Sequence, residues 1–327
     1  MADYTYASAR VKALESALLS SSQIELLVSA KGSDELYSTL YDTYLASYLK
    51  RNTEQDILAA IEEQVSETKE LLISIVPVPT VLDVLWVKYD YHNLMVIVKG
   101  TRTGTSDEEI LRQCYQQGTV EPRLLLSYVR SETLSSCEPE LAAVYRIALE
   151  AKVAGAVDEL CNTSYFDRAL HIATVHRDSF AIAYVQALID LFNVKALARS
   201  ELRETFRLRH PLVSGGVCPI LDTLDPAHVA RTYACYGGED RWKAVVRGVT
   251  EGEPVATLEK LADESFSDWL RMQALYEFGL ASIFSYFHAV KNNAQIISAI
   301  SKAKRANMSE KDLRSILRIR TNNIKRL

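Results

Sequence analysis

Glycine and proline are scarce in this chain, whose 327 residues include only 12 Gly and 8 Pro. These two residues punctuate turns and interrupt helices. Their scarcity, together with abundant Ala, Leu, Glu, Lys and Arg, indicates long helices joined by few loops. Alternating strand patterns are nearly absent as well. We therefore predict an all-α fold.

Cysteine is also sparse, and the five thiols are odd in number and widely scattered. No pair has the C-x-x-C spacing, so the sequence predicts neither a disulfide framework nor a zinc site. A reduced, cytosolic setting fits this usage best. The cysteines are Cys114, Cys137, Cys161, Cys218 and Cys235.

Long hydrophobic runs are missing too. The longest apolar stretch, 71–87, is interrupted by Pro77, Pro79 and Asp83, and it is too short and broken to span about 30 Å of hydrocarbon. The first fifteen residues already form an amphipathic helical pattern instead of a leader with an apolar centre. We therefore expect any membrane role to be peripheral.

Catalytic signatures are absent from the sequence. It contains no G-x-x-x-x-G-K-[ST] loop, no G-x-S-x-G elbow and no H-E-x-x-H motif. The segment Lys99–Gly104 has the wrong spacing for a phosphate loop and is interpreted as a turn between helices. His171 and His176 are five residues apart, which does not place them on one metal-binding helix face. We predict no catalytic residue, no cofactor and no metal site.

Helical periodicity is present instead. Apolar positions recur at spacings of three and four residues, the pattern of a single helical face. One such helix is expected to end near the Pro77/Pro79 pair, because the residue before a proline avoids helical backbone angles. The apolar positions are Ala7, Val11, Leu14 and Leu18, then Leu36, Leu40, Tyr44 and Tyr48, then Ile57, Ile61, Val65 and Leu72.

An internal repeat is the most informative feature. The segment YDYHNLMVIVKG at 89–100 aligns with IDLFNVKALARS at 189–200. Asp90 falls on Asp190 and Asn93 on Asn193, so the two copies are one hundred residues apart (190 − 90 = 100). In each copy the acid and the amide are three residues apart and share one helical face.

Each repeat has two interpretations. The first is a polar hydrogen-bond knot that fixes how helices pack within a unit, because a buried Asn must find partners for its amide groups. The second, less favoured, is direct contact with a partner protein. Lys99 and Arg199, six residues beyond each Asn, lie on another side of the helix. For both residues the sequence favours an interface position and a solvent-exposed position equally.

A third, weaker copy lies near the C-terminus. SDEEILRQC at 106–114 resembles SEKDLRSIL at 309–317, and both open with a capping-box pattern. This anchor places Ile296 at the Asn position, with Asn293 nearby as a substitute. We therefore predict three helical units, 1–112, 113–214 and 215–327, with a loop at 210–219 between the last two.

Charge is distributed unevenly. From residue 291 onward ten basic residues oppose Glu310 and Asp312, which gives +8 and leaves −13 for the rest of a chain of net charge −5. The overall charge predicts no attraction to nucleic acid. A basic end on an acidic body indicates an acidic contact on a protein or a membrane surface. The basic residues are Lys291, Lys302, Lys304, Arg305, Lys311, Arg314, Arg318, Arg320, Lys325 and Arg326.

These residues resemble a known family, the C subunits of the archaeal and bacterial V/A-type ATPases, whose eukaryotic relative is the d subunit. The N-terminus of that family is similar to the opening of this chain, Tyr4-x-Tyr6-x-x-Ala9-Arg10-Val11-x-Ala13-Leu14-Glu15. Tyr91-x-Asn93-Leu94 and Asn193-Val194-Lys195 resemble its repeated Asp-x-x-Asn-Leu-Lys motif. The stretch 276–317 resembles its last repeat, with Ala303-Lys304 in place of a Gly-Lys.

The resemblance implies an architecture and a role. It implies three similar helical subdomains with pseudo-threefold symmetry, forming a funnel with a central socket. The socket would receive the D and F subunits of the central stalk, and the wide face would sit on the membrane rotor ring of c/K subunits. The protein would then lie peripherally on the cytoplasmic face of the cell membrane. It would take part in rotary ion transport and in ATP synthesis or hydrolysis without catalysing a reaction itself.

Within this resemblance, basic residues including Arg199, Lys304 and Arg314 are hypothesised to face acidic groups on the stalk or the ring. Reversing their charges is expected to weaken stalk docking and to leave the thermal unfolding midpoint nearly unchanged.

The residues leave three alternative functions. A helical-repeat interaction adaptor of the armadillo or tetratricopeptide kind would repeat every 34 to 47 residues or so, far less than the spacing here. An all-α enzyme would need convergent carboxylates in a pocket. A nucleic-acid module would rest on the basic tail alone and would show steep salt dependence.

Overall fold

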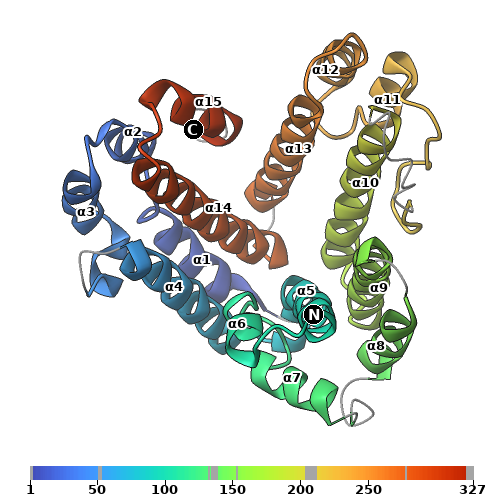
Figure 1. Cartoon of the computed structure of the whole chain (residues 1–327). Helices are drawn as coiled ribbons and strands as arrows, with labels where there is room; N and C mark the ends of the chain where they lie inside the picture. The colour runs from blue at the N-terminus through green and yellow to red at the C-terminus, as the bar shows by residue number, and fades with distance from the viewer. Residues whose placement is uncertain are drawn as a thin grey trace. The chain divides into compact units, whose positions relative to one another are not determined.

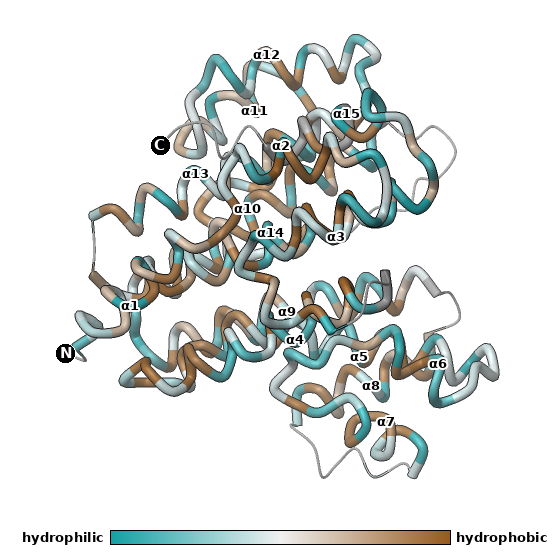
Figure 2. The backbone as a smooth tube through the Cα atoms, turned by 90° about the vertical axis from the view of Figure 1, so that its left-hand side faces the viewer, coloured by the Kyte–Doolittle hydropathy of each residue, from teal (hydrophilic) through white to brown (hydrophobic). Residues whose placement is uncertain are grey.

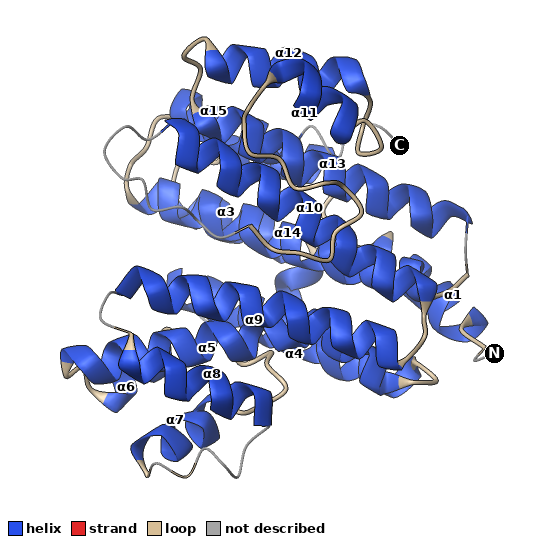
Figure 3. Cartoon of the chain, turned by 90° about the vertical axis from the view of Figure 1, so that its right-hand side faces the viewer, coloured by secondary structure: helices blue, strands red, loops and turns tan. Residues whose placement is uncertain are grey.

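The computed structural model describes residues 3–50, 54–131, 133, 139–151, 154–202, 212–276 and 278–321. Across these ranges every regular element is a helix and none is a strand (Figure 3). The predicted all-α fold is confirmed. Cys137, Lys325 and Arg326 lie outside the described residues, as does the start of the loop expected at 210–219.

The chain divides into two compact units, 1–77 with 259–327, and 78–258. The first unit therefore joins the two ends of the sequence, and the second is one continuous segment. The division into three repeats and their threefold symmetry stay predictions.

In the first unit the long helix α14 packs against α1, α2, α3, α4 and α15. Its buried residues recur through the whole helix from Leu280 to Ala303, so α14 is the centre of this core (Figure 1). The helices of the unit are α1 (Thr5–Glu15), α2 (Ser21–Ser29), α3 (Ser33–Tyr41), the 3-10 helix η1 (Tyr44–Tyr48), α4 (Glu54–Ile75), most of α13 (Val255–Tyr276), α14 (Leu280–Arg305) and α15 (Glu310–Thr321).

In the second unit α5 packs mainly against α9, which also contacts α8 and α10. Helices α11 and α12 pack on each other, with the indole of Trp242 buried and donating to the carbonyl of Tyr236 at 2.7 Å. The helices are η2 (Pro79–Leu82), α5 (Asp83–Thr103), α6 (Asp107–Arg112), α7 (Pro122–Arg130), α8 (Pro139–Glu150), α9 (Ala154–Val175), α10 (Ser179–Leu202), α11 (Pro226–Thr232) and α12 (Glu239–Thr250).

Most of the predicted apolar faces are buried, and hydrophobic and hydrophilic residues interleave along the helices (Figure 2). Helix α4 ends at Ile75, just before Pro77 as predicted. Two expectations were wrong in detail. Helix α1 stops at Glu15 and so excludes Leu18. The stripe through Tyr44 belongs to a separate 3-10 helix, which begins where the Thr43 hydroxyl caps the amide of Leu45.

Helix α10 is long and apolar enough to cross a membrane by length and composition alone, over Ser179–Glu201. However, 67% of its most apolar window is buried inside the protein. It also carries Asp190 and Asn193, both buried and hydrogen-bonded. These are the features of a core helix.

Candidate functional site

The two Asp-x-x-Asn pairs lie at equivalent places on the long helices α5 and α10, and all four side chains are less than 5% exposed. The side-chain amide of Asn93 on α5 makes two hydrogen bonds with the backbone of Tyr115. Its amide nitrogen donates to the Tyr115 carbonyl at 2.8 Å, and its oxygen accepts the Tyr115 amide at 2.8 Å. Asn193 on α10 makes the same pair of bonds with Val213, also at 2.8 Å each.

The acid of each pair holds the next part of the same loop. Asp90 accepts the hydroxyl of Thr119 at 2.6 Å and the amide of Val120 at 3.0 Å. Asp190 accepts the amides of Val217 at 3.2 Å and Cys218 at 3.0 Å. The hydroxyl of Tyr236 adds a third bond at 2.7 Å.

Burial and hydrogen bonding have opposite effects on the pKa of Asp190. Burial raises the pKa of Asp190 above its ordinary 3.8, against the lowering effect of the Tyr236 hydroxyl and the two amides. Removing a carboxylate from water is costly, so the three donors act as compensation for burial.

A glycine in each loop makes this approach possible. A Cβ atom on Gly118 would lie 2.3 Å from the Oδ1 of Asp90, and one on Gly216 would lie 1.9 Å from the Oδ1 of Asp190. Both distances are far inside van der Waals contact. Only glycine lets the loop backbone come this close to the carboxylate.

We call each unit of Asp, Asn, loop and glycine a loop clamp: Asp90 and Asn93 with 115–120, and Asp190 and Asn193 with 213–218. The second loop is shorter by a constant two residues. The Asn-to-loop spacing falls from 22 (115 − 93) to 20 (213 − 193), and the Asp-to-Gly spacing from 28 (118 − 90) to 26 (216 − 190). The two clamps are therefore one structure built twice.

Both pairs thus hold a loop through its backbone groups, whereas the packing interpretation expected contacts between helices; that interpretation and the partner-contact interpretation both stay predictions. The loops and their glycines were not identified as part of the site from sequence. The signal that could have found them is a glycine 28 residues after Asp90 and 26 residues after Asp190. The partners of each Asn are backbone groups, which every residue type except proline offers in full, so the sequence does not reveal them.

The third copy differs. On α14, Asn293 is 5% exposed and Ile296 is fully buried. The amide nitrogen of Asn293 makes no hydrogen bond within the described chain, although the side chain lies beside the Tyr44 hydroxyl. The predicted helix starts are confirmed, since Ser106 caps the amide of Glu109 and Ser309 caps that of Asp312.

Lys99 and Arg199 lie near the C-terminal ends of α5 and α10 and are half-buried. Lys99 forms an ion pair with Asp158 of α9. Both partners are partly exposed, so we expect this pair to stabilise the fold by no more than about 1 kcal/mol. The segment Lys99–Gly104 is not a turn throughout, because α5 continues to Thr103 and ends at Gly104 with φ of 71°.

Lys304 has an internal role that the sequence did not indicate. Its Nζ donates to the carbonyls of Val28 and Ala30 at the C-terminal end of α2. In the other unit, Arg102 of α5 donates in the same way to the carbonyls of Ala148 and Leu149 at the end of α8. A cation on a long helix thus caps the negative end of a short helix in each unit.

Replacing Lys304 with methionine is therefore expected to destabilise the first unit by about 1 kcal/mol, since the carbonyls of α2 lose their cationic partner. Chemical denaturation of the purified chain measures this. The control is Lys302→Met, because Lys302 is exposed on the same turn of α14. Equal stabilities for the two variants would contradict the capping role.

Arg314 on α15 is similarly engaged. Its guanidinium bonds Glu25 of α2 and, at 2.8 Å, Glu310 one turn earlier, and these partners raise its pKa. Because Lys304 and Arg314 both bind α2, reversing either charge is expected to lower stability as well as any docking. Docking by these residues stays a prediction.

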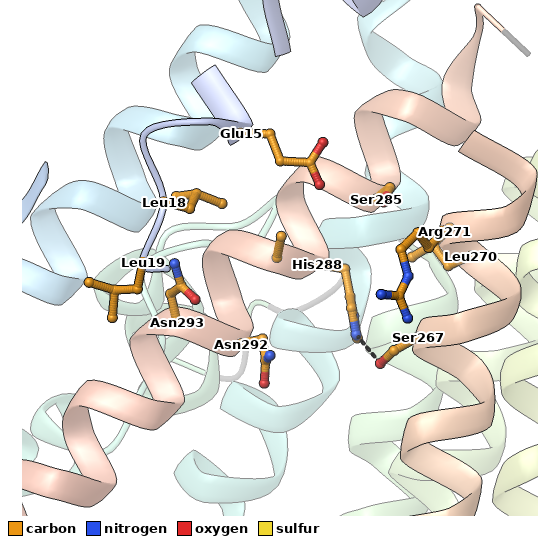
Figure 4. Close-up of a pocket in the computed structure, with 11 residues that line it drawn as sticks. Glu15, Leu18, Leu19, Ser267, Leu270, Arg271, Ser285, His288, Asn292 and Asn293 are labelled. Atoms are coloured by element: carbon orange, nitrogen blue, oxygen red, sulfur yellow. Dashed lines mark hydrogen bonds between the residues drawn. The ribbon is translucent and has the colours of Figure 1, made fainter. Parts of the chain in front are cut away.

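A small cavity of about 170 Å³ lies in the first unit between the end of α1 and helices α13 and α14 (Figure 4). The Nε2 of His288 and the Oγ of Ser267 are hydrogen-bonded there at 3.0 Å. Glu15 also lines it, and burial raises the pKa of this carboxyl. The volume is below the roughly 300 Å³ at which small-molecule pockets begin, so it suits water better than a substrate.

Within the ranges that the structure describes, no group of three His, Cys, Asp or Glu side chains is arranged to hold a metal ion.

Comparison with known proteins identifies one family. A family model described as "ATP synthase (C/AC39) subunit" matches residues 7–316, almost the whole chain. The match includes both loop clamps, Lys304 and Arg314.

Individual relatives are distant but extend over most of the chain. The C subunit of the V-type sodium ATPase of Enterococcus hirae is 20% identical over 317 residues, covering 94% of this chain and 96% of the relative. The C subunit of the A-type ATP synthase of Thermococcus onnurineus is 22% identical over 320 residues, covering 91% and 86%. The C subunit of the V-type ATP synthase of Deinococcus radiodurans is 22% identical over 209 residues, covering 58% of each chain.

Proposed function

Because the chain belongs to the ATP synthase (C/AC39) subunit family, we propose that it is the non-catalytic central-rotor subunit of a V/A-type ATPase. Membership makes it a component of the ATPase complex and a peripheral part of a membrane-associated machine. In the proposal it couples the D and F subunits of the central stalk to the c/K rotor ring on the cytoplasmic face of the membrane. Rotation there serves ion transport and ATP synthesis or hydrolysis.

The single observation that carries this proposal is the family match over residues 7–316. A match of that extent includes the elements of both compact units and not one shared module. The proposal therefore concerns the whole chain as one part of the complex.

The loop clamps support a role in transmitting torque. A protein that couples two partners must pass force between them without dissipating it in loop motion. In both clamps the loop after a long helix is held by an Asn, an Asp and at least four hydrogen bonds. Such loops move as one body with their helices.

A pull-down from native membranes tests the proposal. We expect the affinity-tagged chain to recover the stalk and ring subunits in fixed stoichiometry, because a coupler contacts both. Gly155→Ala is a suitable control variant, since a Cβ there meets no atom within 4 Å, and it should recover the same set. Recovery of the chain alone, or with unrelated proteins only, would instead favour a generic adaptor.

Deletion of the gene gives an independent readout. The catalytic sector should keep its ATP hydrolysis and leave the membrane fraction, and ATP-driven ion transport should disappear. Expression of the parent chain should restore both attachment and transport. If ion transport persists without the chain, it is not the coupling component.

A further inference from the structure

Two cysteines of the second unit lie beside the Asp190 clamp, with their thiols within hydrogen-bonding reach of each other. The amide of Cys218 and the hydroxyl of Tyr236 both donate to the Asp190 carboxylate, at 3.0 and 2.7 Å. Cys235 immediately precedes Tyr236. The Sγ of Cys218 also bonds the carbonyl of Thr232, three residues before Cys235, at 3.3 Å. One carboxylate and one carbonyl thus bring the two segments together.

The two thiols differ in exposure and chemistry. Cys235 is exposed and Cys218 is half-buried. Interaction with the Cys218 thiol lowers the pKa of Cys235 to about 7. The same interaction, reinforced by burial, raises the pKa of Cys218. Of the two thiols, the exposed Cys235 is therefore the more readily deprotonated.

The other described cysteines lack these properties. Burial raises the pKa of Cys114 to about 11 and that of Cys161 to about 12. Thiols in such surroundings are inert, whereas an accessible thiolate beside a second thiol is the arrangement found at redox-sensitive sites. Among the four cysteines that the structure describes, the pair 218 and 235 alone combines both requirements.

We propose that Cys235 and Cys218 form a reversible disulfide when the protein meets a hydroperoxide, with Cys235 as the attacking thiolate and Cys218 as the resolving thiol. The Cys235 thiolate attacks one peroxide oxygen, the O–O bond breaks, and a sulfenic acid forms while the leaving hydroxide takes a proton to become water. Cys218 loses its proton and attacks the Cys235 sulfur, which expels the second oxygen as water. Hydrogen peroxide is reduced to two waters, and two thiols are oxidised to one disulfide.

The disulfide would act on the clamp. It would close a covalent ring around α11 between Cys218 and Cys235, and each of these lies at or next to a residue bonded to Asp190. Oxidation then ties the loop of α10 to the turn after α11. We expect slower hydrogen exchange at the amides of Val217 and Cys218 in the oxidised protein, because their opening would require the linked turn to move as well.

Peptide mapping of the full chain tests the proposal. Trypsin cleaves after Arg231, between the two cysteines, so the disulfide joins two separate peptides. Reduced protein treated with hydrogen peroxide should lose the mass of two hydrogen atoms and yield the Cys218–Cys235 peptide pair. Dithiothreitol should separate the pair. Recovery of Cys235 as sulfinic acid, or bonded to Cys137 or to a second chain while Cys218 stays a thiol, would overturn it.

Single variants assign the roles. In Cys218→Ser, oxidation of Cys235 should stop at the sulfenic acid, which dimedone traps. In Cys235→Ser, oxidation of Cys218 should be slower by roughly tenfold or more, because a neutral thiol is a poor nucleophile. Cys114→Ser is the matched control and should form the disulfide at the parent rate. Trapping on Cys218 but not on Cys235 would contradict the assignment. All readouts use the isolated chain, so the result is independent of the proposed function.

Discussion

Replacing Gly216 with alanine is expected to destabilise the protein by about 3–5 kcal/mol, since hydrogen bonds to a charged group contribute about 1.5–3 kcal/mol each. The new Cβ would lie 1.9 Å from Oδ1 and 2.9 Å from Cγ of Asp190. The carboxylate cannot swing away freely, because Val217, Cys218 and Tyr236 hold it. Either these bonds break or the loop leaves α10.

Urea denaturation and hydrogen exchange of the amides at 217 and 218 measure this loss. Gly155→Ala is the control, because a Cβ there meets no atom within 4 Å. Alanine is the better helix former by up to about 1 kcal/mol, so this variant should be neutral or slightly more stable. Equal stability of the two variants would show that Gly216 does not approach Asp190 as described.

A double-mutant cycle separates the clash from a general backbone effect. In an Asp190→Ala background the oxygen that the new Cβ meets is gone. The Gly216→Ala change should then cost much less than in the parent, because contacting residues couple by about 0.5–3 kcal/mol. If the two losses in free energy of unfolding simply add, the loss caused by Gly216→Ala comes from the backbone of residue 216 and not from a clash with Asp190.

Asn193→Ala is expected to have the second largest effect, about 2–4 kcal/mol. Truncation removes both bonds to Val213. The amide and carbonyl of Val213 then stay buried without partners, since this residue is 3% exposed. An unsatisfied buried polar group costs about 1–3 kcal/mol. The free energy of unfolding, measured by denaturant titration, reports the loss.

The equivalent change in the first clamp provides a graded comparison. Asn93→Ala removes the same two bonds, but Tyr115 is 48% exposed, so water can replace part of what the Asn supplied. We expect a loss of about 1–2 kcal/mol there. Asn162→Ala, at an exposed position on α9, should stay within about 0.5 kcal/mol of the parent. A larger effect at Asn93 than at Asn193 would refute this explanation.

These predictions relate to the proposed coupling role. A variant with a broken clamp should retain its helices, because α5 and α10 are built from their own buried faces. It should nevertheless transmit force less well, since the loop that follows each helix is no longer fastened. Stability and coupling can therefore be compared in the same set of variants.

Several features could be predicted from residues alone. Helix content followed from the scarcity of Gly and Pro, and the end of α4 followed from Pro77. The repeated Asp-x-x-Asn pairs were visible because acid and amide recur at one spacing on one face. The break between α3 and η1 was missed, since the apolar spacing continues across Thr43 while its hydroxyl starts a new helix.

The partners of those side chains were decided by tertiary structure. Asn193 and Asp190 bind backbone groups 20 to 28 residues away, and a backbone amide has no residue type that a sequence pattern can reveal. Lys304 reaches carbonyls 276 and 274 residues away, and Asp190 binds both Cys218 and Tyr236, the residue next to Cys235. The sequence by itself determined which helices form and which polar residues they carry, because both depend on local backbone preference and periodicity. Only the folded chain decided what those residues bind, because that depends on loops approaching helices across long separations in the chain.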